Sequence, residues 1–300
     1  MEQYQDFHSS KFGKITDIIW DGDNTIWDWM KYAVTAYEAM AKAIAAETGK
    51  TEDEVSAAMK KFYTQAGTIE DERLIQGLTK AGFFEGIANF DVNKIIEKAQ
   101  QAFSNARRKN LHLYPEALQV FKTIHEHKIK NRILTDAPAR QAKMRIARLK
   151  LAPFLKQVNA LPSNNDPDLP PIFRAREQAG KYKVNFKVTE IPTQKPHTNL
   201  EEILQMTRAQ IRQHVVIIGD NDLKDMELVR LFGCRGIHAT YGESTAENLQ
   251  RLLKFAPERI AKKNSSTSTP TASTKKPHQG LIVKVKSPAE ILRVLKLDAP

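Results

Sequence analysis

The sequence of 300 residues contains a single cysteine, Cys234, and no long uninterrupted run of apolar residues. One cysteine excludes an internal disulfide and a zinc cluster built from several cysteines, which favours a protein of a reducing compartment. We expect Cys234 to pack in the core as a small apolar residue. No apolar run approaches the roughly 20 residues that cross a bilayer. Residues 1–14 also lack the apolar centre of a signal peptide. We therefore expect a cytoplasmic protein without a transmembrane segment.

The charge of the chain is strongly basic, with 46 Lys and Arg against 35 Asp and Glu and a net charge of +11. Such a balance favours anionic partners, whether phosphorylated substrates, nucleic acid or an anionic membrane surface. The basic residues are scattered, with a modest concentration from Lys122 to Lys150, and no nucleic-acid-binding motif accompanies them. We expect the basic face of the helix at 140–150, which includes Arg145, to be solvated, and a patch that binds an anionic partner is the alternative.

Short apolar runs alternate with helical patterns in much of the chain. Strands are expected at 15–20, 131–135 and 215–220. A helix at 114–127 precedes the second strand, a helix at 140–150 follows it, and a helix at 224–232 follows the third strand. Strands that alternate with helices form a parallel sheet with helices on both faces. We therefore predict a three-layer, Rossmann-like α/β core.

Residues 30–110 carry almost no strand signal and instead repeat helical spacing. Helices are expected at 33–49, 55–67, 70–80 and 92–108. Thr51 and Glu54 have the spacing of a capping box, which marks the start of the second helix. We predict a helical cap inserted at 30–110 into an α/β core that residues 14–29 and 111–300 form.

Two stretches interrupt the α/β pattern. Residues 156–192 contain a loop rich in Asn and Pro and then a strand-like run at 182–191, which together fit an edge hairpin or a partner-binding loop. Residues 262–279 are rich in Ser, Thr, Pro and Lys and almost free of large apolar groups, which predicts disorder. A strand at 281–287 and a helix at 288–297 then complete the core, so the disordered stretch is a loop inside it.

Polar side chains follow the three strands. Those that lie at or just beyond the strand ends are Asp21, Asp23, Thr135, Asp220 and Asp225. The C-terminal ends of parallel strands meet at one edge of a sheet, so we expect these groups to lie close together. Asp21 and Asp23 also point to the same side of an extended chain. An ordinary Asp-Gly-Asp surface turn is the alternative for these two residues taken alone.

These residue types suit phosphoryl transfer. One carboxylate can attack phosphorus and form an aspartyl-phosphate, and a second can protonate the leaving alcohol and then activate water. A hydroxyl and Lys195, which precedes Pro196 where proline can open a helix, can hold the phosphoryl oxygens. Carboxylate oxygens suit Mg²⁺, which lets an anionic nucleophile approach an anionic phosphate.

Taken in order, the motifs resemble those of the haloacid dehalogenase (HAD) superfamily of aspartate-nucleophile phosphohydrolases. The four motifs are DxDxT at 21–25, the strand-terminal Thr135, Lys195, and GDxxxxD at 219–225. The resemblance covers residues 14–262 and resumes at 280–297.

The resemblance implies that Asp21 is the nucleophile and Asp23 the general acid/base. Thr135 and Lys195 would bind the phosphoryl group. Dehalogenases of this superfamily lack an acid at the position of Asp23, so the resemblance favours phosphatase or phosphotransferase chemistry.

The resemblance also implies a Mg²⁺ site. The Asp21 carboxylate, the Asp23 backbone carbonyl and Asp220 would hold the ion, and Asp225 would lie in the outer shell. Asp222 is a competing ligand, because the sequence GDND places two carboxylates close together.

The helical insert resembles the superfamily's cap of the first type, which closes over the site and selects small molecules. We therefore expect a small phosphorylated substrate, although sugar phosphates, phosphoglycolate, nucleotides and phosphoproteins all fit the motifs. Phosphotransfer to a hydroxyl other than water is one alternative. Another is a HAD-scaffold protein that acts mainly by binding an anionic membrane, nucleic acid or a protein.

Overall fold

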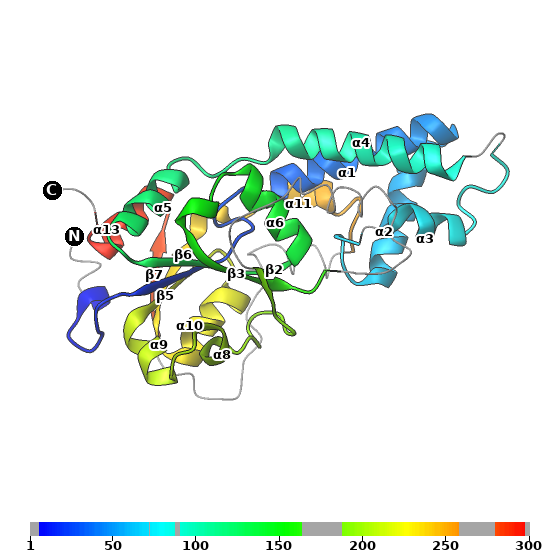
Figure 1. The fold of residues 1–300 in the computed structure, drawn as a ribbon. Coiled ribbons are helices and arrows are strands. Elements are labelled where there is room, and N and C mark those ends of the chain that lie inside the picture. The colour runs from blue at the N-terminus through cyan, green and yellow to red at the C-terminus, as the bar shows by residue number, and fades with distance from the viewer. Residues whose placement is uncertain (1–5, 72, 88–90, 164–187, 258–279, 298–300) are drawn as a thin grey trace.

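A computed structural model describes residues 6–71, 73–87, 91–163, 188–257 and 280–297. These residues form a parallel sheet with the strand order β4-β3-β2-β1-β5-β6-β7 (Figure 1). The strands are β1 (Asp17–Trp20), β2 (Lys130–Pro138), β3 (Leu155–Leu161), β4 (Val188–Glu190), β5 (Val215–Gly219), β6 (Arg235–Ala239) and β7 (Leu281–Val285). The predicted strands at 15–20, 131–135, 215–220 and 281–287 are therefore confirmed.

Helices cover both faces of the sheet (Figure 1). One layer contains α5 (Ala117–Glu126), α6 (Ala139–Arg148) and α13 (Pro288–Leu295), and the other contains α8 (Leu200–Leu204), α9 (Arg208–His214) and α10 (Glu227–Phe232). Consecutive side chains of β1 point to opposite faces, so Ile18 packs in the first layer's core with Phe121, and Ile19 packs in the second layer's core with Leu228. The three-layer α/β prediction is confirmed.

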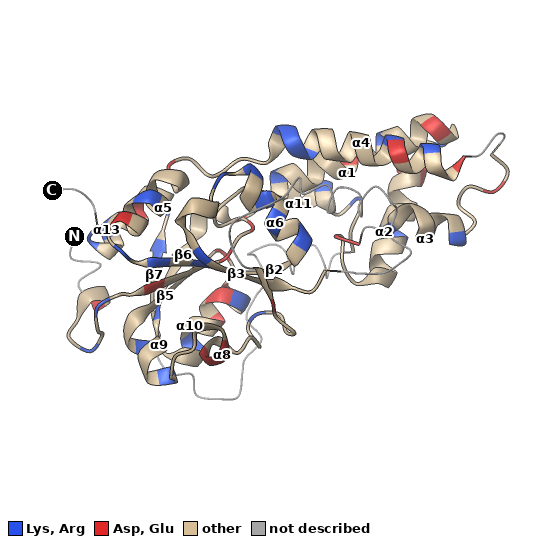
Figure 2. Ribbon diagram, viewed as in Figure 1, with Lys and Arg blue, Asp and Glu red and all other residues tan. Residues whose placement is uncertain are grey.

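Shorter elements connect these layers. They are the turns η2 (Ala152–Phe154), η3 (Asp222–Met226) and η4 (Thr240–Gly242) and the helix α11 (Ala246–Leu252). Cys234 is buried among apolar residues of the second layer, which confirms its predicted place in the core. Lys and Arg lie on helices of both layers and on the helical segment between β1 and β2 (Figure 2).

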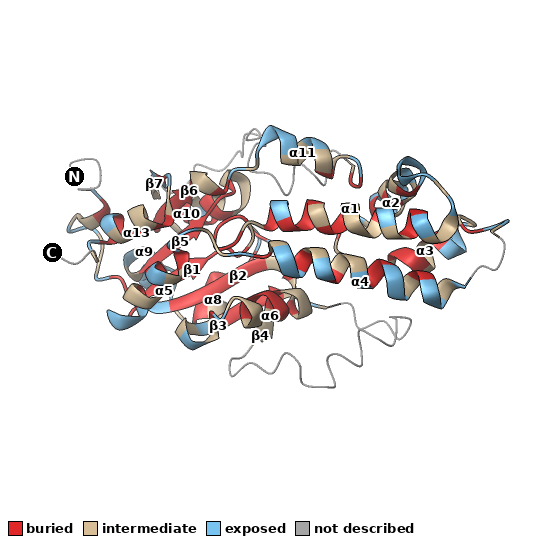
Figure 3. Cartoon of the chain, turned by 90° about the horizontal axis from the view of Figure 1, so that it is seen from above, coloured by how far each residue is buried: buried red, intermediate tan, exposed pale blue. Residues whose placement is uncertain are grey.

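Between β1 and β2 the described residues contain helices and no named strand. These helices are α1 (Trp29–Thr48), α2 (Glu52–Ala66), α3 (Leu74–Lys80) and α4 (Val92–Asn110). Helices α1 and α4 run side by side along their length, with buried residues between them (Figure 3). The predicted capping box is present, because the Thr51 hydroxyl accepts from the Glu54 N–H and the Glu54 carboxylate accepts from the Thr51 N–H. The division into a core and a cap domain stays a prediction.

The sheet contains two strands that the sequence analysis did not predict, β3 and β6. β3 was not expected, because its central residues include polar Asn159. Asn159 is nevertheless buried, and its side-chain amide donates to the carbonyl of Ile133 on β2. β4 lies within the strand-like run expected at 182–191 and pairs with β3 in parallel, so these two strands do not form the edge hairpin that was one of the two expectations for 156–192. Most of the intervening segment, 164–187, and the predicted disordered loop at 262–279 lie outside the described residues.

Two helix starts also differ from the predictions. α8 begins at Leu200 with Asn199 as its cap, so Pro196 does not open it. α5 begins at Ala117 and not at Tyr114, because Glu116 has a φ of 66° and interrupts the helical backbone. Neither difference changes the order of the elements. Among the helices that the structure describes, none has both the length and the apolar character needed to cross a membrane.

Candidate active site

The strand order reverses at β1, which lies between β2 and β5. In open α/β sheets, ligand sites form at such a switch point, because the loops that leave the neighbouring strands diverge and open a crevice. Asp21 follows β1 directly, and its N–H donates to the carbonyl of Ile218 on β5 at 2.8 Å. Thr135 lies within β2, and Asp220 follows β5. The sheet therefore delivers three of the predicted residues to one edge.

A tight turn after Asp21 fixes the first motif. The carbonyl of Gly22 accepts from the N–H of Ile26 at 2.9 Å. Asn24 has a φ of 60°, a left-handed conformation that Asn tolerates, and its side chain accepts from the N–H of Met30 at 3.0 Å. The turn thus connects directly to the first residues of α1 and sets the direction in which Asp23 leaves the sheet edge.

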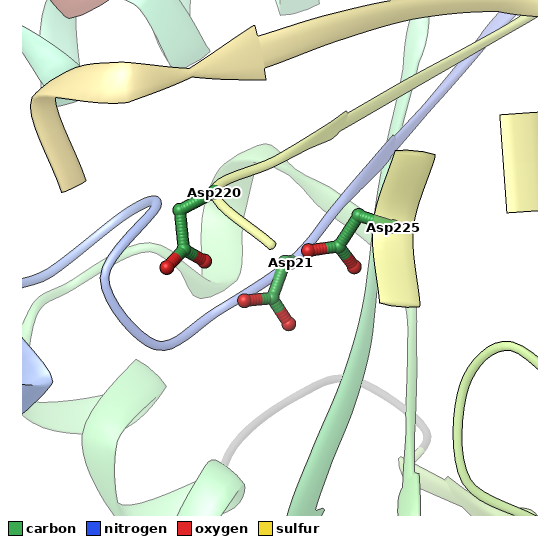
Figure 4. A group of neighbouring side chains, drawn as sticks. All are labelled: Asp21, Asp220 and Asp225. Carbon is green, nitrogen blue, oxygen red and sulfur yellow. The ribbon is translucent and has the colours of Figure 1, made fainter. Parts of the chain in front are cut away.

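Asp21, Asp220 and Asp225 form an acidic cluster in which one ligand atom of each lies within 4.8 Å of the others. Figure 4 shows the three carboxyl groups gathered around a common space. Thr25 Oγ1 donates to Asp220 at 3.2 Å, and the Asn221 N–H donates to Asp225 at 3.2 Å. These bonds fix the orientation of two of the three carboxylates.

Gly219 is required for this arrangement. A Cβ atom at Gly219 would lie 2.2 Å from the carboxyl carbon of Asp225, far inside van der Waals contact. The glycine of the fourth motif therefore makes room for the last aspartate of the same motif.

Lys195 is buried and joins two members of the cluster. Its Nζ donates to Asp21 and, at 2.5 Å, to Asp225. Its backbone N–H donates to Asp136 at 3.0 Å, and Asp136 also pairs with Lys224 at 2.9 Å. A loop between β4 and α8 thus places an ammonium group against carboxylates from β1 and η3.

Burial governs the protonation of these groups. Burial raises the pKa of Asp21 to about 7, although the ammonium group of Lys195 opposes the shift. The pKa of Asp220 is raised well above its ordinary value by burial and by the charges of Asp21 and Asp225. Burial lowers the pKa of Lys195, but the negative charges of Asp21 and Asp225 have the larger effect and raise this pKa well above its ordinary value. One ammonium group therefore faces three carboxylates, an excess of negative charge that a cation would relieve.

The Asp23 carboxylate lies outside the acidic cluster and forms a separate network of hydrogen bonds. Both of its carboxylate oxygens accept from Nη1 of Arg145 at 2.9 Å, and one accepts from Trp27 Nε1 at 2.6 Å. Arg145 also donates to Glu70 in the connection between α2 and α3. Trp29 Nε1 donates to the same Glu70 at 3.3 Å. Burial raises the pKa of Asp23, and Arg145 opposes that shift.

The position of Arg145 corrects the expectation that the basic face of this helix is solvated. Arg145 is only 1% exposed, because it lies on the inward side of α6 near Ala142 and Ile146. A hydrophobic pattern assigns arginine to the exposed face of a helix. It contains no information about Asp23 and Glu70, the two carboxylates from other elements that bind Arg145 in the interior.

One cavity is lined by most of the predicted residues. Its lining includes Asp21, Asp23, Thr135, Lys195, Asp220 and Asp225. Thr135 is buried there, and its Oγ1 accepts from the N–H of Ala137 at 3.1 Å. Asp222 is not brought to the cluster, since its carboxylate pairs with Arg230 of α10 at 2.7 Å. The arrangement presents several carboxyl groups, an ammonium group and a hydroxyl to one space.

The sequence prediction missed several members of the site. Lys224 and Asp136 also line the cavity, and each lies next to a motif residue in the sequence, which is a usable signal. Glu70 and Arg145 carry no such signal, because they meet across 75 positions of the chain.

Comparison with known proteins places the chain in a family. The family model for haloacid dehalogenase-like hydrolases matches residues 18–185, more than half of the chain. The chain therefore belongs to this family of hydrolases. The matched region contains Asp21, Asp23 and Thr135 and ends before Lys195. No curated protein sequence matches the chain.

The chain is also similar to solved structures at low sequence identity. A haloacid dehalogenase-like hydrolase from Xanthomonas campestris is 13% identical, with 94% of this chain and 96% of that chain covered and a TM-score of 0.52. A HAD phosphatase from Thermococcus onnurineus is 12% identical, with 94% and 98% covered and a TM-score of 0.49. An L-2-haloacid dehalogenase from Xanthobacter autotrophicus is 17% identical, with 94% and 98% covered and a TM-score of 0.43. These similarities concern the fold and do not select a reaction.

Proposed function

We propose that the chain is a Mg²⁺-dependent phosphatase that hydrolyses phosphate monoesters through an aspartyl-phosphate on Asp21. The observation that carries the proposal is the convergence of Asp21, Lys195 and the acidic cluster in one cavity, with Asp23 on its wall. A nucleophile beside a cation and a separate acid is the set of groups that phosphoryl transfer requires.

The first half-reaction begins at Asp21. Its carboxylate oxygen attacks phosphorus, the bond between phosphorus and the ester oxygen breaks, and Asp23 gives a proton to the departing oxygen. Lys195 and Thr135 hold the phosphoryl oxygens as negative charge moves onto them. In the second half-reaction Asp23 takes a proton from water, which attacks the same phosphorus. The acyl–phosphate bond breaks, and inorganic phosphate and the Asp21 carboxylate are restored.

The donor set fits a magnesium ion. Mg²⁺ prefers oxygen ligands, and the cluster offers carboxylates of Asp21, Asp220 and Asp225 with more negative charge than Lys195 neutralises. We propose Asp21 and Asp220 as carboxylate ligands, with the backbone carbonyl of Asp23. When bound, the ion supplies positive charge that lets an anionic nucleophile approach an anionic phosphate.

The ion pair between Asp23 and Arg145 limits when Asp23 can act as an acid. A guanidinium that contacts both oxygens stabilises the charged form of Asp23. Glu70 shares the same guanidinium and so weakens its hold on Asp23. This balance supports a role in which Asp23 alternates between protonated and charged forms.

The test is release of inorganic phosphate from a panel of phosphate monoesters, with Mg²⁺ and with EDTA. Asp21→Asn should lower kcat on the order of 10³-fold or more, because the nucleophile is lost. Asp222→Asn is the matched control, since its carboxylate pairs with Arg230 and lies outside the cavity lining. Full activity in Asp21→Asn would reject the mechanism.

The other functions expected from the sequence can be separated from hydrolysis. Phosphotransfer would appear as phosphorylated product when alcohol acceptors are added to the same assay. A role in binding an anionic surface would appear as salt-sensitive binding that Asp21→Asn leaves intact. Lys and Arg are distributed over several described elements (Figure 2).

A further inference from the structure

A second cavity lies within the helical segment formed by α1–α4. Carbon-rich side chains dominate its lining, including Tyr37, Tyr63, Phe103, Met40, Leu74 and Ile75. Tyr37 and Tyr63 contact each other edge to face with ring centroids 5.6 Å apart, and Tyr37 also lies 5.4 Å from the ring of Phe103. These aromatic side chains line an interior suited to a flat apolar group.

This cavity adjoins the active-site cavity. Trp29, Ile69 and Glu70 line both cavities. Arg145 lines the second cavity and binds Asp23 in the first. Asp23, the proposed proton donor to the leaving oxygen, therefore lies close to the junction. A phosphoryl group at Asp21 would leave the rest of its ester directed toward the second cavity.

The second cavity carries a polar group that lacks a partner. Gln100 on α4 is only 8% exposed, and its buried Oε1 has no hydrogen-bond partner among the described residues. Gln76, on the facing helix α3, also has a buried Oε1 without a partner in that part of the chain. Because a buried acceptor without a donor is unfavourable, an aromatic group that also carries a hydrogen-bond donor should bind here more tightly than one without a donor.

The charged groups of this lining already have partners. Asp71 pairs with Arg73 at 2.6 Å, and Arg145 pairs with Asp23 and Glu70. The guanidinium of Arg107 donates to the side-chain carbonyl of Gln141 at 2.9 Å. A bound group therefore needs no charge of its own to neutralise these side chains. A sugar is also a poor fit, because most of its hydroxyls would face aromatic and aliphatic carbon and lose their hydrogen bonds to water.

We propose that the second cavity receives the leaving group of the substrate, and that this group is an uncharged aromatic alcohol. The inference rests on the proposed phosphatase function and narrows its substrate class to aromatic phosphate monoesters. The carbon-rich walls favour this class over sugar phosphates, and the position of Asp23 beside the junction places the proposed acid near the leaving oxygen.

The first experiment compares kcat/KM for 2-naphthyl phosphate, ribose 5-phosphate and acetyl phosphate in the wild-type protein with Mg²⁺. We expect 2-naphthyl phosphate to exceed ribose 5-phosphate by about 10–100-fold, the range that apolar pocket contacts supply. Equal values, or a preference for ribose 5-phosphate, would overturn the inference and leave the proposed phosphatase function standing. Failure of all three substrates with folded protein would instead count against the phosphatase function.

A second experiment uses binding, which requires no turnover. 2-Naphthol is titrated by calorimetry into the Asp21→Asn protein. Ala99 is buried on α4 and lines the cavity, so Ala99→Trp should fill the space and abolish binding. Gln101→Trp is the matched control, because Gln101 is exposed on the same helix and should leave binding intact. Absence of binding, or binding that Ala99→Trp leaves unchanged, would show that the cavity is not the aromatic site.

Discussion

Arg145 holds Asp23 by both carboxylate oxygens, each 2.9 Å from the same guanidinium nitrogen. The arginine comes from α6 on the sheet, and it also donates to Glu70 between α2 and α3. One buried side chain therefore connects the first motif, the α/β core and the helical segment. This connection, invisible in the sequence, motivates the first prediction.

Replacing Arg145 should strongly destabilise the fold. Arg145→Met leaves Asp23 and Glu70 buried without their cation, and loss of one partner from a buried pair costs about 3–5 kcal/mol. Urea unfolding at pH 7 measures the change. Lys143→Met, at a half-buried position on the same helix, is the control and should change stability by about 0.5 kcal/mol or less. Equal effects of the two substitutions would show that the buried ion pair contributes little.

The stability of the metal-free protein should depend on the charge of Asp21. Its folded-state pKa of about 7 exceeds the ordinary value of 3.8. Between these values the folded protein retains a proton that the unfolded chain has lost, so this group's contribution to stability falls as pH rises. The full cost is present above pH 7 and amounts to at most about 4 kcal/mol.

Asp21→Asn removes that cost because the amide stays neutral. In EDTA at pH 8 the variant should therefore melt at a higher temperature than the wild type, and the difference should shrink toward pH 5. Thermal unfolding at both pH values measures it. A difference that grows as pH falls would contradict the sign of the pKa shift.

Magnesium affinity should depend on Asp220 and not on Asp222. Asp220→Asn removes a proposed carboxylate ligand and should raise the Mg²⁺ concentration at half-maximal activity by at least about 10-fold. Asp222→Asn should leave this concentration nearly unchanged, because the Asp222 carboxylate pairs with Arg230. Titration with Mg²⁺ after EDTA treatment measures both. A larger increase in this concentration for Asp222→Asn than for Asp220→Asn would indicate that Asp222 is the metal ligand.

Gly219→Ala should displace Asp225. The added methyl group would meet the carboxyl group of Asp225, and such overpacking costs about 1–3 kcal/mol. We expect lower stability and lower kcat. In a double-mutant cycle, the same substitution in an Asp225→Gly background should cost much less, because the carboxyl group and the Cβ atom that would clash are gone. An unchanged cost in that background would place the strain elsewhere.

Much of the α/β core follows from local patterns. Buried parallel strands read as short apolar runs, and residues 15–20 and 215–219 show this signal because both faces of the sheet are covered. β3 escaped prediction, because buried Asn159 is satisfied by the carbonyl of Ile133, a long-range contact. Local periodicity therefore identifies strands whose burial is purely apolar and misses those whose polar residues find distant partners.

The sequence by itself determined the order of the motifs, the strand ends that carry Asp21 and Asp220, and the glycine that admits Asp225. These features depend on neighbouring residues, so spacing along the chain records them. Only the tertiary structure decided that Lys195 bridges Asp21 and Asp225, that Asp222 turns to Arg230, and that Arg145 is buried against Asp23. The reason is physical: the environment of a charged side chain is set by groups that folding brings together from distant segments, and a one-dimensional pattern contains no record of those distances.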